Sequence, residues 1–304
     1  MNDTESEIQS KRLKILDRQE LRNMFDLPDF TSDERDEHFS LTALEKDFLT
    51  NLRSISSKLY FILQTGYFKS RHQFFNFEFN EVKEDAEYIL QKYFSEQKIN
   101  IEKVKVVAKS TRLIHQNNIL QIHNYRLCGE SEREIIAGKA RSFAKISGKP
   151  IFIFREIVTF LQEKLIVLPG YSILQEIVGQ ALVFEQSRLV ELLKNDLSSS
   201  QIEKLDILLG NTEGLYEITQ LKKEPKDFTL KEIKGEIERA DQIREIYLFS
   251  QDLLPKFEIS NESITYYASM VSYYSVYKLK RFDRSHRQTI SIVLRSAKIQ
   301  TSER

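Results

Sequence analysis

Polar side chains that can hydrogen-bond to DNA bases gather at the start of one predicted helix, within residues 110–126 (STRLIHQNNILQIHNYR). Its first two turns carry Arg112, His115, Gln116, Asn117 and Asn118. Recognition helices present their N-terminal residues to the major groove, where Arg suits guanine and Asn or Gln suits adenine. The pattern therefore predicts base reading by this helix. The alternative is that these amides are only solvated.

The same helix needs a cap and an inner face. Ser110 or Thr111 is expected to cap it, while Leu113, Leu120 and the aliphatic side of Ile114 are expected to face the core. Asparagine pairs are poor helix formers, so their presence favours a functional reason.

Basic side chains recur close to the predicted helices and extend the candidate DNA-binding set. Lys69 and Arg71 follow a helix in a loop, a position that suits phosphates, which fix register without carrying sequence information. The other members of the set are Arg53, Lys58, His72, Lys105, Lys109, Lys139, Arg141 and Lys145.

The stretch from Thr42 to Phe79 predicts two short helices followed by a basic, aromatic turn. Thr42 with Glu45 has the spacing of a capping box, which begins the first helix. Two closely joined helices that lead into cationic residues resemble a helix-turn-helix, although an ordinary helical hairpin is the alternative.

Four phenylalanines follow, at positions 74, 75, 77 and 79. They could form a stacking platform for unpaired bases. A loop held against the core is the favoured interpretation.

The motifs of common catalytic sites are missing from the sequence. It contains no Gly-rich phosphate loop, no HExxH, no paired CxxC and no nucleophile elbow. His115, His123 and Cys128 lie close in sequence but lack an evident fourth ligand for zinc. We therefore expect no catalysis, no metal and no cofactor.

Composition favours a helical protein of the cytosol. The 304 residues are 41% hydrophobic and 30% charged, with only 9 glycines and 5 prolines. The start is not a secretory signal, no run is apolar enough to span a membrane, and the single Cys128 suits a reducing compartment. Because the formal net charge is zero, a DNA-binding surface requires local segregation of charge.

Capping boxes and 3.6-residue periods predict an all-α fold: an array of helix-turn-helix-like modules followed by a helical bundle. The expected caps are Thr31, Thr42, Ser131, Ser172, Ser200 and Thr229. Leu-Pro-Gly at 168–170 is the strongest predicted boundary. The expected parts are a basic arm or helix (1–25), DNA-binding modules (26–168), a dimer-organising bundle (169–282) and a divergent polar tail (283–304).

Several segments, in the same order, resemble the N-terminal region of Tn3-family transposases. They are LTALEKDFLTNLRSISSKLYFILQTGYFKSRHQFF (41–75), KSTRLIHQNNILQIHNYR (109–126), LPGYSILQEIV (168–178), LYEITQLKKEPKDFTLKEIKGEIER (215–239) and YYASMVSYYSVYKLKR (266–281). The resemblance covers about residues 15–282. It implies helical modules that bind the terminal inverted repeats of a transposon, followed by a helical part that helps to organise a dimer.

The family's catalytic RNase H-like domain follows this region, whereas the chain continues as RQTISIVLRSAKIQTSER. The catalytic carboxylates therefore have no counterparts here, which is expected of a truncation, a frameshift or a cloned fragment.

Two functions follow as hypotheses. The first is binding of double-stranded terminal-repeat DNA in the bacterial cytoplasm, at the nucleoid, with a second copy or a full-length transposase as a possible partner and no membrane. The second is a helical interaction scaffold or regulatory fragment without significant DNA binding.

Overall fold

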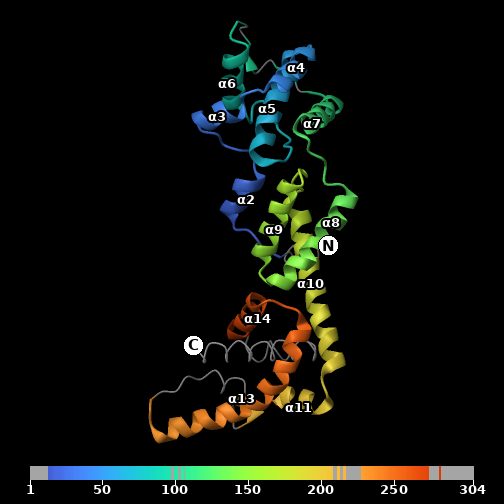
Figure 1. Cartoon of the computed structure of the whole chain (residues 1–304). Helices are drawn as coiled ribbons and strands as arrows, with labels where there is room; N and C mark the ends of the chain where they lie inside the picture. The colour runs from blue at the N-terminus through green and yellow to red at the C-terminus, as the bar shows by residue number, and fades with distance from the viewer. Residues whose placement is uncertain are drawn as a thin grey trace, which may run out of the picture. The chain divides into compact units, whose positions relative to one another are not determined.

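The computed structural model describes residues 13–96, 99–101, 104–105, 107–207, 211–212, 215–216, 227–273 and 281. The fold is all-α, as predicted, with one short antiparallel pairing of β1 (Asn211–Thr212) and β2 (Leu215–Tyr216) (Figure 1). The helices are α2 (Arg18–Phe25), α3 (Ser32–His38), α4 (Ala43–Asn51), α5 (Ile55–Arg71), α6 (Lys83–Tyr93), α7 (Lys109–His123), α8 (Glu130–Ile146), α9 (Pro150–Glu163), α10 (Tyr171–Asp196), α11 (Ser199–Ile207), α13 (Leu230–Phe257) and α14 (Asn261–Tyr273). Residues 1–12 of the predicted arm and the predicted tail at 283–304 lie outside the described residues.

Capping boxes begin several helices. Thr31 with Glu34 begins α3 and Thr42 with Glu45 begins α4, each as predicted. In both pairs the threonine side chain accepts from the glutamate amide, and the glutamate side chain accepts from the threonine amide. Asp17 forms an equivalent box at α2 that the sequence analysis missed.

Other predicted caps lie inside their helices, because each helix begins earlier in the chain. They are Ser110 and Thr111 in α7, Ser131 in α8, Ser172 in α10 and Ser200 in α11. Ser198 caps α11 instead, through reciprocal bonds with Gln201. Thr229 accepts from the Glu232 amide at the start of α13, as predicted.

The chain forms two compact units. The first takes its described residues from 1–136 and 155–176, and the second from 137–154 and 177–304. The chain therefore passes from one unit to the other within α8, within α9 and within α10. The predicted boundary at 168–170 is the break between α9 and α10, and residues on both sides of that break belong to the first unit.

Helix α5 is the core helix of the first unit. Residues 59–68 are all buried, and α3, α6 and α7 pack against this helix (Figure 1). Ten consecutive buried residues cover every direction around a helix. This stretch of α5 therefore cannot lie in a DNA groove, and only the two ends of the helix remain candidates for DNA contact.

The phenylalanines after α5 belong to the core. Phe75, Phe77 and Phe79 are buried in the cluster that surrounds α5, and Phe74 stacks on Phe68 with ring centroids 4.9 Å apart. The favoured interpretation of the sequence is confirmed, because buried rings are not available to stack on bases.

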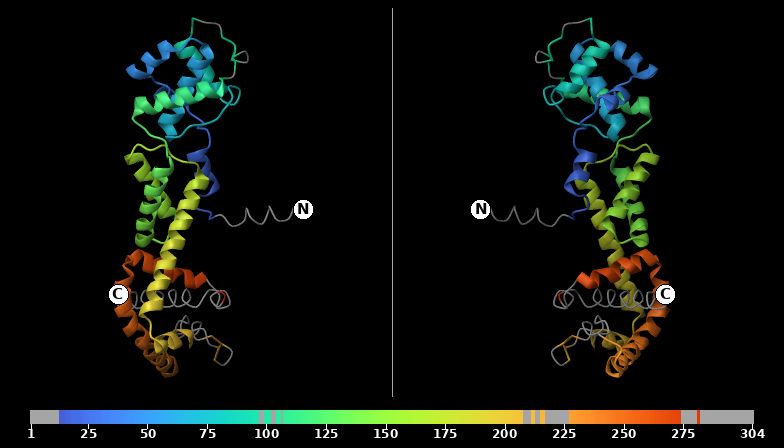
Figure 2. Two further views of the ribbon diagram at one scale, coloured as in Figure 1. Left: turned by 90° about the vertical axis from the view of Figure 1, so that its right-hand side faces the viewer. Right: turned by 90° about the vertical axis from the view of Figure 1, so that its left-hand side faces the viewer.

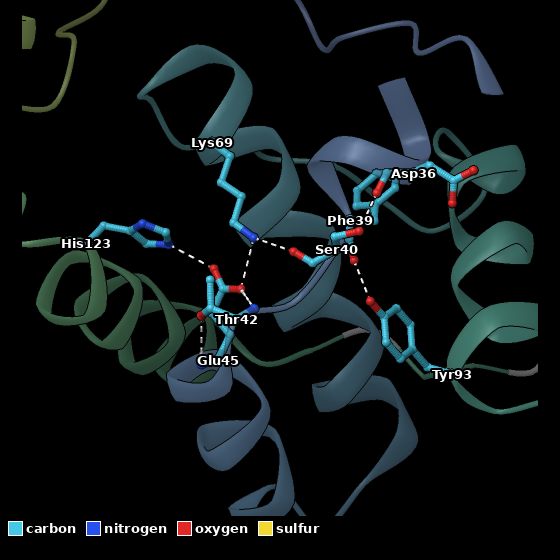
Figure 3. Close-up of polar contacts among 8 residues, drawn as sticks. All are labelled: Asp36, Phe39, Ser40, Thr42, Glu45, Lys69, Tyr93 and His123. Atoms are coloured by element: carbon cyan, nitrogen blue, oxygen red, sulfur yellow. Dashed lines mark hydrogen bonds and ion pairs between the residues drawn. The ribbon is translucent and has the colours of Figure 1, made fainter. Parts of the chain in front are cut away.

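Polar bonds connect α3, α5 and α6 across the first unit. The Arg35 side chain donates to Asp85 over 2.7 Å, and the Tyr67 hydroxyl donates to the other oxygen of the same carboxylate, also over 2.7 Å. The Tyr93 hydroxyl donates to the Phe39 carbonyl over 2.7 Å (Figure 3). The carboxylate of Asp85 thus joins three helices while remaining buried.

The second unit has its own apolar core. Leucines of α10 and α11 pack against Leu253 and Phe257 of α13 and against Ile264 and Tyr267 of α14 (Figures 1 and 2). The α10 leucines are Leu189 and Leu193. Removing each such side chain from water contributes on the order of 2 kcal/mol.

Gly66 gives a test of the packing at the centre of the first unit. A methyl group at this position would overlap the buried ring of Phe39 and lie 3.3 Å from the His38 carbonyl oxygen. We expect Gly66→Ala to lower the midpoint of thermal unfolding, although alanine is favoured over glycine in a helix by about 1 kcal/mol.

Gly138→Ala in α8 is the matched control, since nothing lies within 4 Å of its added methyl group. That variant is expected to hold or raise the midpoint, measured by circular dichroism. A Gly66→Ala protein that unfolds at or above the wild-type midpoint would show that the packing of Phe39 is looser than described.

Candidate nucleic-acid interface

Some residues predicted to contact DNA are bound to other groups of the protein or buried, and others are exposed to solvent. The side chains of Lys69 and Arg112 form ion pairs within the protein, and His115 is buried. Arg53, Lys105, Lys109 and Asn117 are exposed. Lys58 and Gln116 are partly exposed.

Lys69 binds a buried carboxylate. Its ammonium lies 2.9 Å from Glu45 Oε2 and donates to the Ser40 carbonyl over 2.7 Å (Figure 3). The other oxygen, Glu45 Oε1, lies 3.0 Å from His123 Nε2, and the Thr42 amide donates to Oε2 over 2.6 Å. Glu45 is fully buried, so this contact set joins α4, α5 and α7.

The pKa of Glu45 reflects these partners. Burial by itself raises the pKa, but bonds from His123, Lys69 and the Thr42 amide outweigh it and lower the pKa to about 2. Glu45 is therefore ionised at neutral pH. The charge of Lys69 is compensated by Glu45, and its phosphate contact stays a prediction.

Arg71 and His72 end the same helix. Burial lowers the pKa of the Arg71 guanidinium, whose Nε has no described hydrogen-bond partner. His72 stacks on Tyr125 with centroids 5.2 Å apart, and its carbonyl accepts from the Leu168 amide over 2.9 Å. Both side chains are half-buried, so they offer less to a phosphate than loop residues would.

Arg112 is held by three groups. Its Nε donates to the Val107 carbonyl over 2.9 Å, its Nη2 lies 3.2 Å from Glu78, and its guanidinium lies 5.4 Å from the centre of the Tyr60 ring. These contacts fix the start of α7 against α5. The guanidinium of Arg112 is thus held by protein groups, and its base contact stays a prediction.

His115 is fully buried among Phe48, Tyr60 and Phe61, with ring centroids 5.8–6.0 Å away. Neither ring nitrogen has a hydrogen-bond partner among the described residues. Burial lowers the pKa of the imidazole to about 4. The structure thus places His115 in the core, where its ring is not exposed to a ligand.

The burial of His115 rotates α7 relative to the predicted orientation. Ile119 and Leu120 are buried as well, while Leu113 and Ile114, which the sequence analysis directed inward, are 52% and 56% exposed. The sequence would have predicted this orientation of α7 if His115 had been counted as an apolar ring. Positions 115, 119 and 122 then share the side of the helix that faces the core.

Four of the remaining cations lie in the chain at or just before the start of α5 or α7. Tyr60 lies against the start of α7 and Phe68 against its end, at His123, so α5 and α7 run in the same direction. Their N-terminal ends therefore lie together. Lys58 lies in the first turn of α5, and Arg53 precedes that helix by two residues. Lys109 begins α7, and Lys105 precedes that helix by four residues.

These four cations have no described ion-pair partner, and neither helix has an acidic residue in its first turn. The carboxylate of Glu78, close to the start of α7, forms its described ion pair with Arg112. Positive charge at helix N-termini adds to the partial charge of the exposed amides, which suits an anion.

The predicted basic residues of α8 belong to the second unit. Arg141 lies over the Phe184 ring, 4.6 Å from its centroid, and Lys145 lies 3.5 Å from Glu258. Lys139 is exposed. These three residues therefore belong to a different compact unit from the cations of α5 and α7.

Residues 15–181 match the family described as a domain of unknown function, DUF4158. The chain belongs to the DUF4158 family. The DUF4158 match covers more than half of the sequence and includes every residue predicted to contact DNA. A comparison with curated proteins finds no match.

In the described part of the chain, no helix is long and apolar enough to cross a membrane. No group of three or more His, Cys, Asp or Glu side chains there is arranged to hold a metal ion.

Removing the Lys69 charge should destabilise the first unit. Lys69→Met leaves the buried Glu45 carboxylate with fewer partners, and we expect a loss of roughly 2–4 kcal/mol in the free energy of unfolding. Lys83→Met, which removes an exposed pair with Glu87 at 3.8 Å, should cost less than about 0.5 kcal/mol. Urea titration distinguishes them, and equal effects would contradict the role given to Lys69.

His115 should make stability depend on pH. Its folded pKa of about 4 lies below the ordinary 6.5, so the unfolded chain binds the proton more readily between these values. Stability is then complete above about pH 6.5 and declines as the pH falls towards 4. The decline attributable to His115 is on the order of 3 kcal/mol.

His115→Leu removes the titrating ring and keeps an apolar side chain in the core. The difference in unfolding free energy between this variant and the wild type should widen as the pH falls from about 6.5 to 4. A difference that stays constant across this range would show that the imidazole is protonated without cost.

Proposed function

We propose that the chain binds the terminal inverted-repeat DNA of a transposon, as the N-terminal part of a Tn3-family transposase. Strand-transfer chemistry is not part of this proposal. Membership of the DUF4158 family is consistent with it, and the five collinear segments that resemble that transposase region support it.

The observation that carries the proposal is that two helices running in the same direction, α5 and α7, each have two cations in or just before the first turn. These cations are Arg53, Lys58, Lys105 and Lys109. A chain with zero net charge gains affinity for DNA only where its charges are segregated. Here several cations have no described ion-pair partner, and the nearby helix starts lack acidic residues. Phosphates of one duplex can be neutralised by such a group.

Neutralising phosphates releases counterions, and this makes the affinity depend on salt. The slope of log affinity against log salt is about −0.9 for each phosphate contacted on duplex DNA. A surface that uses all four cations would give a slope of about −3.6. Sequence preference has to come from other groups, because phosphate contacts carry none.

A protein-interaction scaffold is the second candidate, and one feature of the second unit favours it. Leu230, Ile233 and Ile237 of α13 are exposed and spaced along one helical face. Such a stripe suits a partner helix, including one from a second copy of the chain. Light scattering on the DNA-free protein tests this candidate independently.

The double variant Lys105→Gln/Lys109→Gln tests the DNA-binding proposal. We expect the magnitude of the salt slope to fall by about 1.8, since two phosphate contacts are lost. Affinity should be measured by fluorescence anisotropy on a duplex carrying the terminal repeat of the element that encodes the chain, and on a scrambled duplex.

The control is Lys83→Gln/Lys164→Gln, which removes two exposed cations outside this group and should leave the slope unchanged. A wild-type protein with no measurable affinity for either duplex, or with a flat salt dependence, would refute the proposed function.

A further inference from the structure

The solvent face of α7 differs from the face that the sequence predicts. Residues three and four positions apart share a side of a helix, and the exposed residues of α7 follow that spacing. They are Lys109, Ser110, Leu113, Ile114, Asn117 and Gln121. Arg112 and His115 lie outside this face, the first held against Glu78 and Tyr60 and the second in the core.

Two properties of this face favour nucleic acid over a protein partner. The sequence of α7, KSTRLIHQNNILQIH, contains no acidic residue, and the face begins at Lys109, one of the four cations described above. The centre of this face has two exposed aliphatic side chains, Leu113 and Ile114, followed by the amides of Asn117 and Gln121. The occupant that complements this charge is a polyanion with apolar groups and paired hydrogen-bond donors and acceptors.

We infer that α7 enters the major groove of duplex DNA with this face and reads A·T base pairs. The thymine C5-methyl group is the apolar feature of the groove, and Leu113 and Ile114 supply its apolar counterpart. The amides of Asn117 and Gln121 suit N6 and N7 of adenine. The fifteen residues of α7 extend about 22 Å, and a helix fits a groove about 12 Å wide.

The inference rests on the proposed function and adds to it the class of base pair and the residues that recognise it. Arg112 becomes a positioning residue, because it fixes the start of the helix against Tyr60. Gln116, only partly exposed, lies beside the face. Asn117 is the single residue shared with the base-reading set that the sequence analysis favoured.

Selection from a pool of random-sequence duplexes provides the first measurement. The wild-type protein should enrich a motif that contains adjacent A·T pairs. Replacing a thymine of this motif by deoxyuridine removes only the methyl group, and we expect affinity to fall about fourfold at a contacted position. Replacing a contacted adenine by 7-deazaadenine removes one acceptor of a bidentate pair, and affinity should fall at least several-fold.

Variants connect each base group to its side chain. Leu113→Ala should no longer distinguish thymine from deoxyuridine, and Asn117→Ala should no longer distinguish adenine from 7-deazaadenine. Leu44→Ala is the matched control, since Leu44 is 65% exposed on α4 and lies outside the proposed face. It should keep both discriminations, and all variants should unfold near the wild-type midpoint.

The failures of the two proposals are distinguishable. Salt-dependent binding in which Leu113→Ala and Asn117→Ala keep both discriminations overturns the assignment of this face and leaves the proposed function intact. The assignment of this face to DNA is also overturned if Leu113→Ala changes the oligomeric state of the DNA-free protein but leaves its DNA selectivity unaltered. That result identifies the face as a protein interface. Absence of binding to every duplex refutes both.

Discussion

The carboxylate of Glu45 is the interaction on which the first unit depends. It is fully buried, and it accepts from Lys69 of α5, from the amide of Thr42 and from the His123 ring of α7. A buried charge is tolerated only when its partners replace the lost hydration. The side chain of Glu45 also completes the capping box of α4. The residue that begins α4 in the sequence is therefore also the one that connects α4 to α5 and α7.

This arrangement determines where the unit can meet a ligand. With α4 antiparallel to α5 and α7 parallel to it, the core helix is enclosed between positions 59 and 68. Lys69 neutralises Glu45, whereas Arg53, Lys58, Lys105 and Lys109 have no described ion-pair partner. Zero net charge is compatible with a local excess of positive charge, because the net charge is a sum over the whole sequence.

Local signals in the sequence predicted the all-α class, the boxes at Thr31 and Thr42, and the burial of the phenylalanines after α5. The orientation of α7 was not predictable in this way. A histidine is normally counted as polar, and His115 is instead buried as a ring, which turns Leu113 and Ile114 outward. Lys69 was assigned to DNA because its partner Glu45 lies on another helix, a pairing that sequence spacing cannot show.

The chain crosses from one unit to the other three times, and this limits how the protein can be truncated or recombined. Each of α8, α9 and α10 begins in one unit and ends in the other, so no single cut in the sequence yields either unit whole. A fragment ending before α9 would lack residues 155–176 of the first unit, including Val167, which packs against Phe61 and Phe68. Recombination at a single point can therefore neither transfer one unit to another protein nor delete it cleanly, and the two units are expected to be exchanged between genes together.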